Sequence, residues 1–443
     1  MRYITKPIFI IVTALILMML SIQADAARVL TLAEIRSLAL EYNRTYLTSL
    51  EDIRQAESDI TTARSSALPN LTLSAGYNRN LKLGSFFVNA DGQDPIEFKT
   101  GFKNDFTAAL TARQSIWKGG KVFNAYKVAK MYKKYALSGS NTVKAEVINS
   151  VEQLYFAALL ANSNLEVIKK AHEANSKNLD VIQKLYNQGL ASEFELLRAK
   201  VEKSNLEPQI LEAESEVRLS KKRLLSFLGL PLDDEIYLEE PTDDTTADNT
   251  ALRDMLVAAH KNRPEMNQAE LLVDITDKAI SIAQADYYPQ LEALSTYSWS
   301  SQSDKFTLSD NKVESWTAGV QLTLPIFNGG ETKGAVNNYR TENNRAQLAL
   351  SELKDAISLE TEEAYDRYHQ ALETLAIQKN TIAQAEEGLR IANLRYESGV
   401  GTQFEVLSAI AALTQARNAK AQALFTLRKA KSDLRKVTTL EIN

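Results

Sequence analysis

The second half of this sequence repeats the order of motifs found in the first half. The segment LYNQGLASEFELL at 185–197 recurs as RYESGVGTQFEVL at 395–407, at an offset of 210 along the chain. The segment IWKGG at 116–120 recurs at the same offset as IFNGG at 326–330. Because two separate landmarks share one offset, the sequence indicates a tandem duplication, and any structure formed by the first half should be formed twice.

A third pair of landmarks shows where the two halves differ in length. The offset between Pro69 and Pro289 is larger by ten, so the first half has ten extra residues before its Gly-Gly pair. The extra residues fall within 81–103, whose counterpart is 301–313. A length change of this kind is tolerated at an exposed hairpin tip.

Each repeat is predicted to contain a helix, a β-hairpin, a very long helix, a tight turn and a return helix. Only 16 glycines and 9 prolines interrupt the 443 residues, which favours long helices. In the first repeat, 27–230, the pattern predicts helices at about 44–66, 121–187 and 193–229 and strands at about 68–80 and 104–117. In the second repeat, 251–443, it predicts helices at about 264–286, 331–397 and 403–438 and strands at about 289–300 and 314–327.

The flanks of the repeats have their own patterns. Short amphipathic helices should precede the repeats at 31–41 and 251–261, and an acidic linker, 231–250, should connect them. Pro208 lies inside the predicted helix 193–229, where its missing N–H and its ring predict a kink. Pro264, in contrast, suits the first turn of a helix.

The N-terminal segment, 1–26, has the pattern of a secretory signal peptide. Arg2 and Lys6 form a basic region, residues 7–20 are apolar, and Ala-Asp-Ala at 24–26 offers a cleavage site. The alternative is a membrane anchor, but a spanning helix needs about 20 apolar residues, more than this run provides. The chain is therefore expected to leave the cytoplasm.

The composition excludes several classes of protein. No cysteine is present, so the chain has no disulfide, no cysteine metal site and no lipid-acceptor cysteine. A formal net charge of −5 gives no sign of a nucleic-acid partner. After the predicted signal peptide no apolar run is long enough for a spanning helix, so any membrane crossing must use strands closed into a barrel, because lipid cannot satisfy an open sheet edge.

The predicted strands alternate between apolar and polar residues, which is the period of a strand rather than of a helix. In WTAGVQLTL at 316–324, apolar side chains occupy the even positions and Thr, Gly, Gln and Thr occupy the odd ones. Residues 71–78 and 106–113 alternate in the same way, and 291–299 is less regular. The three tryptophans, which resemble an interfacial aromatic girdle, lie in or at the ends of these strands: Trp117, Trp299 and Trp316.

Two structures are compatible with this alternation. Soluble hairpins packed on helices would alternate too, but strands of roughly 10 to 13 residues are close to the ~9–11 that cross a bilayer when tilted. Four strands cannot close a barrel, so a membrane location requires several subunits. Two subunits would supply about 8 strands, whose interior side chains fill, whereas three would supply about 12 and leave a lumen. A channel therefore favours three or more subunits.

The two long predicted helices determine the overall dimensions. Each would extend about 100 Å at 1.5 Å per residue, which is too long for a globular core. Their apolar side chains form a narrow stripe among charged neighbours, for example Leu350, Leu353, Ile357 and Ala364. Helices in a wall with water on both sides require this pattern. An extended coiled coil without a lumen would show it as well.

Neither catalysis nor a cofactor or metal site is indicated by the sequence. The three histidines, His172, His260 and His369, lie apart on predicted helices, with no HExxH motif or carboxylate at ligand spacing. We expect them to be surface residues. The pair Gly399 and Gly401 joins two helices rather than a strand and a helix, so it is not a phosphate-binding loop.

The duplicated order of motifs resembles the TolC-type outer-membrane efflux proteins over essentially the whole mature chain. The resemblance rests on LPNLTLSAGY, YPQLEALSTY, LTLPIFNGG, NRPE and the two tip motifs YNQGLASEFELL and YESGVGTQFEVL. It implies a mainly α fold with a transmembrane β-barrel, in which three duplicated subunits form a 12-strand barrel and a 12-helix periplasmic barrel. It also implies an outer-membrane location, contact with lipid, and two partners, a periplasmic adaptor (membrane fusion protein) and an inner-membrane transporter.

The resemblance also assigns roles to residues at the two turns. In the family the tips contact the adaptor, which maps onto Gly189, Leu190, Gly399 and Val400. The tunnel entrance maps onto Tyr186, Glu195, Tyr396 and Glu405, and six such carboxylates in a trimer would attract cations. The alternative is that the glutamates are solvated and the tyrosines only pack the helix ends. Gly401 and Ser408 stand where other members have a basic and an acidic residue, so no gating ion-pair network is expected.

Two functions are compatible with these patterns. One is an export channel for toxic compounds or for proteins, and the other is a periplasmic coiled-coil adaptor or scaffold. An adaptor should carry lipoyl-like or β-barrel domains beside a helical hairpin, and the sequence contains no segment suited to them. The sequence therefore favours the channel.

Overall fold

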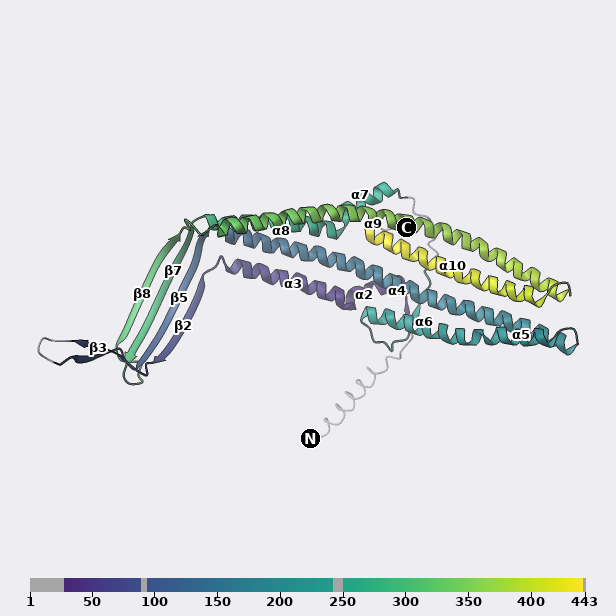
Figure 1. Cartoon of the computed structure of the whole chain (residues 1–443), viewed down its shortest axis with the longest axis horizontal. Helices are drawn as coiled ribbons and strands as arrows, with labels where there is room; N and C mark the ends of the chain where they lie inside the picture. The colour runs from purple at the N-terminus through teal and green to yellow at the C-terminus, as the bar shows by residue number, and fades with distance from the viewer. Residues whose placement is uncertain (1–27, 89–93, 242–249, 441–443) are drawn as a thin grey trace, which may run out of the picture. The chain divides into compact units, whose positions relative to one another are not determined.

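The computed structural model describes residues 28–88, 94–241 and 250–440 (Figure 1). The predicted signal peptide, 1–26, lies outside these residues. The described part forms two compact units, one from 51–139 and 267–353 and the other from the remaining segments, so each unit contains parts of both repeats. None of the helices in the described part of the chain combines the length and the hydropathy of a membrane-spanning segment.

The first unit is built on one antiparallel sheet of four strands (Figure 1). The strands are β2 (Asn70–Arg79), β5 (Asn104–Lys118), β7 (Gln290–Ser303) and β8 (Lys312–Thr323), and their order in the sheet follows the chain. The two hairpins, one from each repeat, are joined through β5 and β7, which pair from Asn104↔Ser303 to Lys118↔Gln290. The duplication therefore produces a single sheet rather than two.

The register of the sheet places apolar side chains together on one face. Leu73 pairs with Leu110, Leu110 with Tyr297, and Tyr297 with Trp316, so these four form a row across all four strands. Their exposures are 73%, 40%, 42% and 78%. Since large apolar side chains are costly in water, this face needs a cover that the single chain does not supply.

The opposite face of the sheet is polar in the same register. Thr72, Thr111, Thr296 and Thr317 pair in sequence and form the neighbouring row across the four strands. Because successive residues of a strand point to opposite faces, this threonine row and the apolar row lie on opposite sides. The hydroxyl oxygens of Thr111 and Thr296 are 3.4 Å apart.

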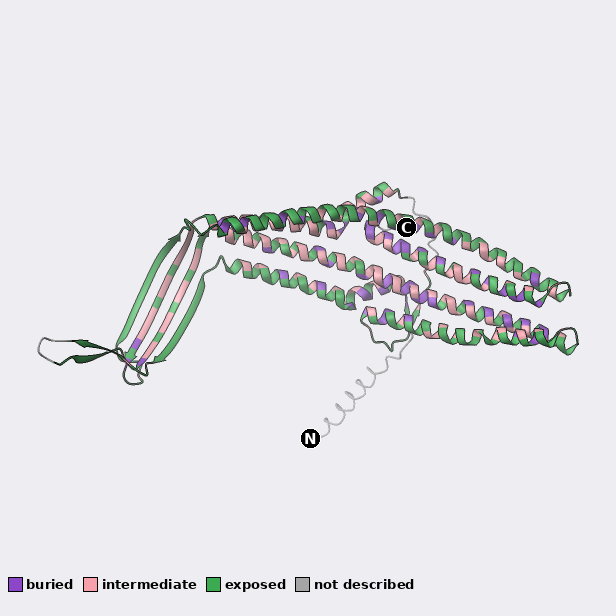
Figure 2. Ribbon diagram, in the orientation of Figure 1, coloured by how far each residue is buried: buried purple, intermediate pink, exposed green. Residues whose placement is uncertain are grey.

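The outer strands leave the edges of the sheet free. β2 and β8 are the first and last strands in the sheet order, and all of their residues are exposed (Figure 2). Free edges carry unpaired N–H and C=O groups that another chain can pair with. The ten extra residues of the first repeat belong to a further hairpin, β3 (Gly84–Val88) with β4 (Ile96–Thr100).

The strands pass into long helices through glycine turns. α4 (Lys121–Asn187) follows β5, and α9 (Glu331–Glu397) follows β8; each is an uninterrupted helix of 67 residues. A Cβ on Gly119 would lie 2.5 Å from the carbonyl oxygen of Ala285, which follows α8 (Pro264–Gln284) in the short helix η1 (Ala285–Tyr287). Gly119 also has a φ of +59°, so both space and backbone conformation require glycine at this turn.

The second unit contains the remaining helices and a short parallel pair of strands. The helices are α2 (Leu32–Tyr42), α5 (Glu193–Ser204), α6 (Leu206–Leu228), α7 (Leu252–Asn262) and α10 (Gln403–Thr438), with α3 (Arg44–Ser65) beginning here. β1 (Arg28–Leu30) pairs with β6 (Ile236–Leu238), a contact that the sequence pattern did not indicate.

The helix predicted over 193–229 consists of two helices that meet at Asn205. Proline has no N–H to donate, and its ring clashes with the carbonyl four residues earlier. For Pro208 that carbonyl belongs to Ser204, the last residue of α5. The interruption therefore lies one turn before the proline.

Each repeat has its own apolar core in this unit. The first core gathers residues of β1, α2, α4 and α6, including Leu30, Ile35, Val151, Tyr155, Leu224 and Leu228. The second core gathers residues of α7, α9 and α10, including Met255, Tyr368, Leu375, Leu427 and Leu434. Both cores are narrow, and much of each helix surface remains exposed (Figure 2).

A buried carboxylate links the two repeats within this unit. Glu152 on α4 is 1% exposed, and its oxygens accept hydrogen bonds from Arg36 Nε at 2.6 Å and from Arg435 Nη1 at 3.2 Å and 3.3 Å. The hydroxyl of Ser432 on α10 is a further donor, at 2.5 Å. A buried carboxylate is tolerated only when opposite charges and donors surround it, as they do here.

We expect the substitution Glu152→Ala to destabilise the protein by about 2 kcal/mol, because it leaves two arginines without their carboxylate. This value is below that for a fully buried pair, since Arg36 and Arg435 are about one-third exposed. Thermal unfolding followed by far-UV circular dichroism should show a lower midpoint. The exposed Glu173, paired with Lys177 at 2.7 Å, offers the control Glu173→Ala. Equal midpoints for both variants would contradict the assignment.

Candidate functional site

The first of the two predicted tips is the turn between α4 and α5. The N–H of Leu190 donates to the carbonyl of Leu185 at 2.8 Å, and the N–H of Gly189 donates to that of Tyr186 at 2.9 Å. These are the bonds of a Schellman cap, which needs a left-handed residue just past the helix. Gly189 has a φ of +75°, and no atom lies within 4 Å of the position of a Cβ, so the backbone conformation is what requires glycine.

The second tip, between α9 and α10, has the same cap at the equivalent position of the second repeat. Val400 donates to Arg395 at 3.0 Å, Gly399 donates to Tyr396 at 3.0 Å, and Gly399 has a φ of +74°. One further bond runs from the N–H of Gly401 to the carbonyl of Arg395 at 2.9 Å. A Cβ on Gly401 would lie 2.9 Å from both the Cβ of Arg395 and the backbone nitrogen of Tyr396. The second turn is therefore closed more tightly.

The two predicted entrance carboxylates have different partners. Glu195 accepts from the N–H of Ser192 at 2.8 Å, and its own N–H donates to the Ser192 hydroxyl at 3.3 Å, which is a capping box. Glu405 donates its N–H to the hydroxyl of Thr402 at 3.3 Å, but its carboxylate accepts from Nε of Arg395 at 3.3 Å. The equivalent glutamates are thus a helix cap in one repeat and an ion pair in the other.

The pairing of Glu405 changes the electrostatics expected at this end of the helices. Both side chains of the Arg395–Glu405 pair are about half exposed, so water screens the pair, and such pairs contribute only about 0–1 kcal/mol. The arginine nevertheless offsets one of the two negative charges in each chain. Glu195 has no such arginine among the ion pairs of the described residues.

The two predicted tyrosines also differ in their surroundings. Tyr396 is partly buried and packs against apolar residues of both tips, namely Ile182, Leu196, Ala199, Ala392, Val406 and Ile410. Burial raises the pKa of the Tyr396 hydroxyl, and the charge of Glu195 raises it further. Tyr186 is exposed and is not part of either cluster. The structure therefore brings Tyr396 and Glu195 together across the repeats.

Two contacts at the tips were not anticipated from the sequence. The amide of Gln403, which is 3% exposed, donates to the carbonyl of Glu195 at 2.9 Å and so connects the two return helices. The guanidinium of Arg198 lies 5.2 Å from the ring centre of Phe404, within cation–π range. The sequence contained one hint at the special role of Gln403. The equivalent position of the first repeat is the charged Glu193, so the two repeats differ here.

Apolar side chains are exposed at both turns. Leu190 and Val400, the equivalent residues that follow the two glycines, are 72% and 70% exposed. Further exposed apolar residues lie on the return helices: Phe194, Leu197 and Val201 on α5 and Phe404 on α10. Exposed apolar residues at both turns are typical of an interaction surface.

Among the described residues, no group of three or more His, Asp or Glu side chains could hold a metal ion. The three histidines predicted to be surface residues are each partly exposed. His172 and His369 are half-buried, with Nε2 atoms that have no hydrogen-bond partner among the described residues, and His260 Nε2 lies 2.9 Å from the hydroxyl of Ser358. His369 packs against Tyr365, with their ring centres 4.2 Å apart.

Known proteins with similar sequences define the family to which this architecture belongs. Residues 35–230 and 255–439 match the family described as outer membrane efflux protein. The fusaric acid resistance protein FusA of Burkholderia cepacia is 24% identical over 289 residues, which is 64% of this chain and 54% of FusA, so the match spans about half of that relative. The outer membrane protein TolC of Vibrio cholerae is 20% identical over 380 residues, 85% of this chain and 83% of TolC.

The fold has solved counterparts as well. The crystal structure of the outer membrane protein VceC from Vibrio cholerae matches with a TM-score of 0.75 at 19% identity, over 92% of this chain and 95% of VceC. The fold is thus that of a duplicated outer-membrane protein with long helices. The chain belongs to the outer membrane efflux protein family. This membership confirms the predicted resemblance, the outer-membrane location and the preference for a channel protein over a periplasmic adaptor.

We expect Gly401→Ala to loosen the second turn, because the added Cβ must push against Arg395 and the backbone of Tyr396. Overpacking of this kind costs about 1–3 kcal/mol, so amide hydrogen exchange at 395–405 should become about tenfold faster. Ala191 occupies the equivalent position of the first turn, and the reverse change Ala191→Gly serves as the matched control. Unchanged exchange in Gly401→Ala would show that the turn is not tightly closed.

Proposed function

We propose that this chain is one of three identical subunits of an outer-membrane channel, whose long helices continue as a duct into the periplasm. The channel passively conducts substrates delivered by an inner-membrane transporter through a periplasmic adaptor. The observation that carries the proposal is the apolar row Leu73, Leu110, Tyr297 and Trp316, which runs across the whole sheet and is exposed in the single chain.

The apolar face of the sheet supports its location in the hydrocarbon core of the outer membrane. The apolar row would contact lipid, and the threonine row on the other face would line water. Trp316, whose Nε1 donates to the hydroxyl of Ser295 at 3.0 Å, keeps its one polar group satisfied within the sheet. An apolar face with internally satisfied donors is what lipid requires.

The free edges of β2 and β8 support a closed assembly of copies. In lipid the unpaired backbone groups of an edge strand have no water to bond, so each edge must pair with a strand of another subunit. Four strands per chain make a barrel of about 12 strands in a trimer, which is wide enough for a lumen, whereas about 8 strands are filled by their own side chains. The lumen is the reason for choosing three.

The two turns support contact with an adaptor at the other end of the helices. Leu190 and Val400 are exposed, equivalent and placed by rigid caps that Gly189 and Gly399 make possible. Tyr186, Glu195, Tyr396 and Glu405 would then line or support the entrance beside these contacts. Because Glu405 is paired with Arg395, Glu195 is the less opposed of the two entrance carboxylates in this proposal.

The geometry of the sheet and the helices indicates only the general kind of cargo. A threonine-lined sheet and a helical duct offer few directed contacts, so the choice of cargo belongs to the transporter. FusA is named for resistance to fusaric acid, which fits the removal of a toxic compound. Toxic-compound efflux is therefore the first role to test, with protein secretion as the second.

Purified protein added to a planar bilayer should open single channels that prefer cations. We expect Glu195→Gln to lower the cation-to-anion permeability ratio roughly twofold, and Glu405→Gln to lower it less, because Arg395 already offsets Glu405. Glu173→Gln on α4 removes the same charge away from the turns and is the control. A protein that gives no conductance, and that urea washes from outer membranes, would overturn the channel.

A separate test addresses the adaptor. The double substitution Leu190→Asp with Val400→Asp should reduce cross-linking of the chain to its adaptor in cells about tenfold, because both exposed contacts become charged. Conductance in planar bilayers should remain. Val257→Asp, at an exposed apolar residue of α7, is the matched control. Undiminished cross-linking would remove these residues from the adaptor contact.

A further inference from the structure

The start of α4 differs strongly from the start of α9, although the two helices are equivalent in the duplication. Residues 118–135 contain six lysines and no acidic residue: Lys118, Lys121, Lys127, Lys130, Lys133 and Lys134. The equivalent residues 328–345 contain Lys333, Arg340 and Arg345 together with Glu331 and Glu342. The excess of positive charge is therefore specific to the first repeat, and helix formation alone does not explain it.

This basic segment begins where the apolar face of the sheet ends. After the irregularity in β5 between Ser115 and Trp117, Trp117 pairs with Leu291, which pairs with Leu322 on the apolar face. Lys118 is the last residue of β5, and α4 begins at Lys121. Headgroup layers add about 5–8 Å on each side of the hydrocarbon. The first lysines therefore lie at the depth of the headgroups if the apolar face contacts lipid.

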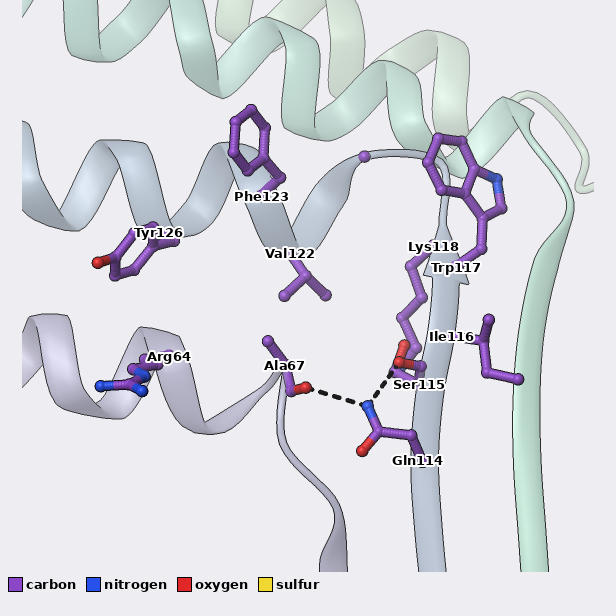
Figure 3. A pocket seen from close by; sticks show the side chains of 11 residues that line it. Arg64, Ala67, Gln114, Ser115, Ile116, Trp117, Lys118, Val122, Phe123 and Tyr126 are labelled. Carbon is purple, nitrogen blue, oxygen red and sulfur yellow. Dashed lines mark hydrogen bonds between the residues drawn. The ribbon is translucent and has the colours of Figure 1, made fainter.

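A cavity of ≈ 790 Å³ lies at this junction (Figure 3). It is lined by residues from α3, from the end of β5 and from the start of α4, including Arg64, Gln114, Trp117, Lys118, Phe123 and Tyr126. The amide of Gln114 donates to the carbonyls of Ala67 at 3.0 Å and of Ser115 at 2.8 Å, which ties the floor of the cavity to the end of α3 (Figure 3). One side chain of the lining, that of Gln114, is thus held in place by hydrogen bonds.

The charged side chains around the cavity are predominantly positive, and only some of them form ion pairs with the described residues. Lys121 pairs with Asp286 at 2.9 Å and Lys133 pairs with Glu57 at 2.8 Å. Arg64 and Lys118, which line the cavity, make no ion pair among the described residues. These two cations line the cavity from different elements, Arg64 from α3 and Lys118 from the end of β5 (Figure 3).

Aromatic rings and the helix start add to this environment. Lys127 lies 4.3 Å from the ring centre of Phe123, and Lys130 lies 4.5 Å from that of Tyr126, so both ammonium groups are held close to rings that line the cavity. Gly120 and Val122 also line it, where the first N–H groups of α4 have no partner within the helix. Such N–H groups and the helix dipole favour an anion.

We propose that this cavity binds the phosphate headgroup of an anionic phospholipid from the periplasmic leaflet of the outer membrane. The inference rests on the proposed membrane orientation of the sheet. Arg64 and Lys118 donate to the phosphodiester, while Trp117 and the exposed Ile116 contact the glycerol and the first acyl carbons. Lys127 and Lys130 disfavour a lipid whose headgroup ends in a cation, so phosphatidylglycerol binds better than phosphatidylcholine.

The test uses the full assembled protein in detergent, titrated with phosphatidylglycerol, phosphatidylcholine or inorganic phosphate and followed by native mass spectrometry. We expect retained phosphatidylglycerol at concentrations where phosphatidylcholine is absent, and at least a tenfold loss of that binding in the triple variant Arg64→Gln, Lys118→Gln, Lys127→Gln. The control Lys333→Gln, Arg340→Gln, Arg345→Gln removes three exposed charges from the equivalent part of the second repeat. It should bind phosphatidylglycerol like the parent.

Each other outcome overturns the inference. Equal loss in the control variant would mean that net charge rather than the cavity retains the lipid. Inorganic phosphate that displaces phosphatidylglycerol at equal concentration would mean that the site is for a soluble anion. Conductance in planar bilayers separates this inference from the channel itself: channels without preference for phosphatidylglycerol refute only the lipid site, whereas no channels in any lipid refute the proposed function.

Discussion

Every backbone N–H and C=O group in a hydrocarbon layer needs a partner within protein, because lipid offers none. The sheet meets this requirement along β5 and β7 and leaves it unmet along β2 and β8. Its apolar face and its threonine face add a second asymmetry, since apolar side chains gather on one side of the sheet and hydroxyl groups on the other. The proposed assembly of several subunits depends on these two unpaired edges.

Duplication supplies the two hairpins of this sheet, and the contact between β5 and β7 makes them one. At the turns the copies have kept their backbone and changed their side chains. Gly189 and Gly399 make the same cap with nearly the same φ, whereas Glu195 caps its own helix and Glu405 pairs with Arg395. Backbone geometry is thus retained where two rigid turns are needed, and side chains are free to specialise.

The long helices depend on few buried groups, because a helix with water on much of its surface has room for only a narrow core. Glu152 is one of these buried groups. Its carboxylate accepts hydrogen bonds from Arg36 on α2 and from Ser432 and Arg435 on α10. Its charge is compensated by side chains that are far away along the chain in both directions. Apolar packing and one satisfied buried charge together hold the two repeats to each other within this unit.

Local patterns in the sequence were sufficient for the mainly helical class, the duplication and the family, because period, glycine turns and motif order are properties of short segments. The predicted roles of the four entrance residues and the four tip residues remain predictions. Tertiary structure alone decided that Tyr396 contacts the first repeat, that Gln403 bonds to Glu195 and that Arg395 opposes Glu405. These contacts join residues brought together by the folding of two helical hairpins, and no local period encodes which side chains then meet.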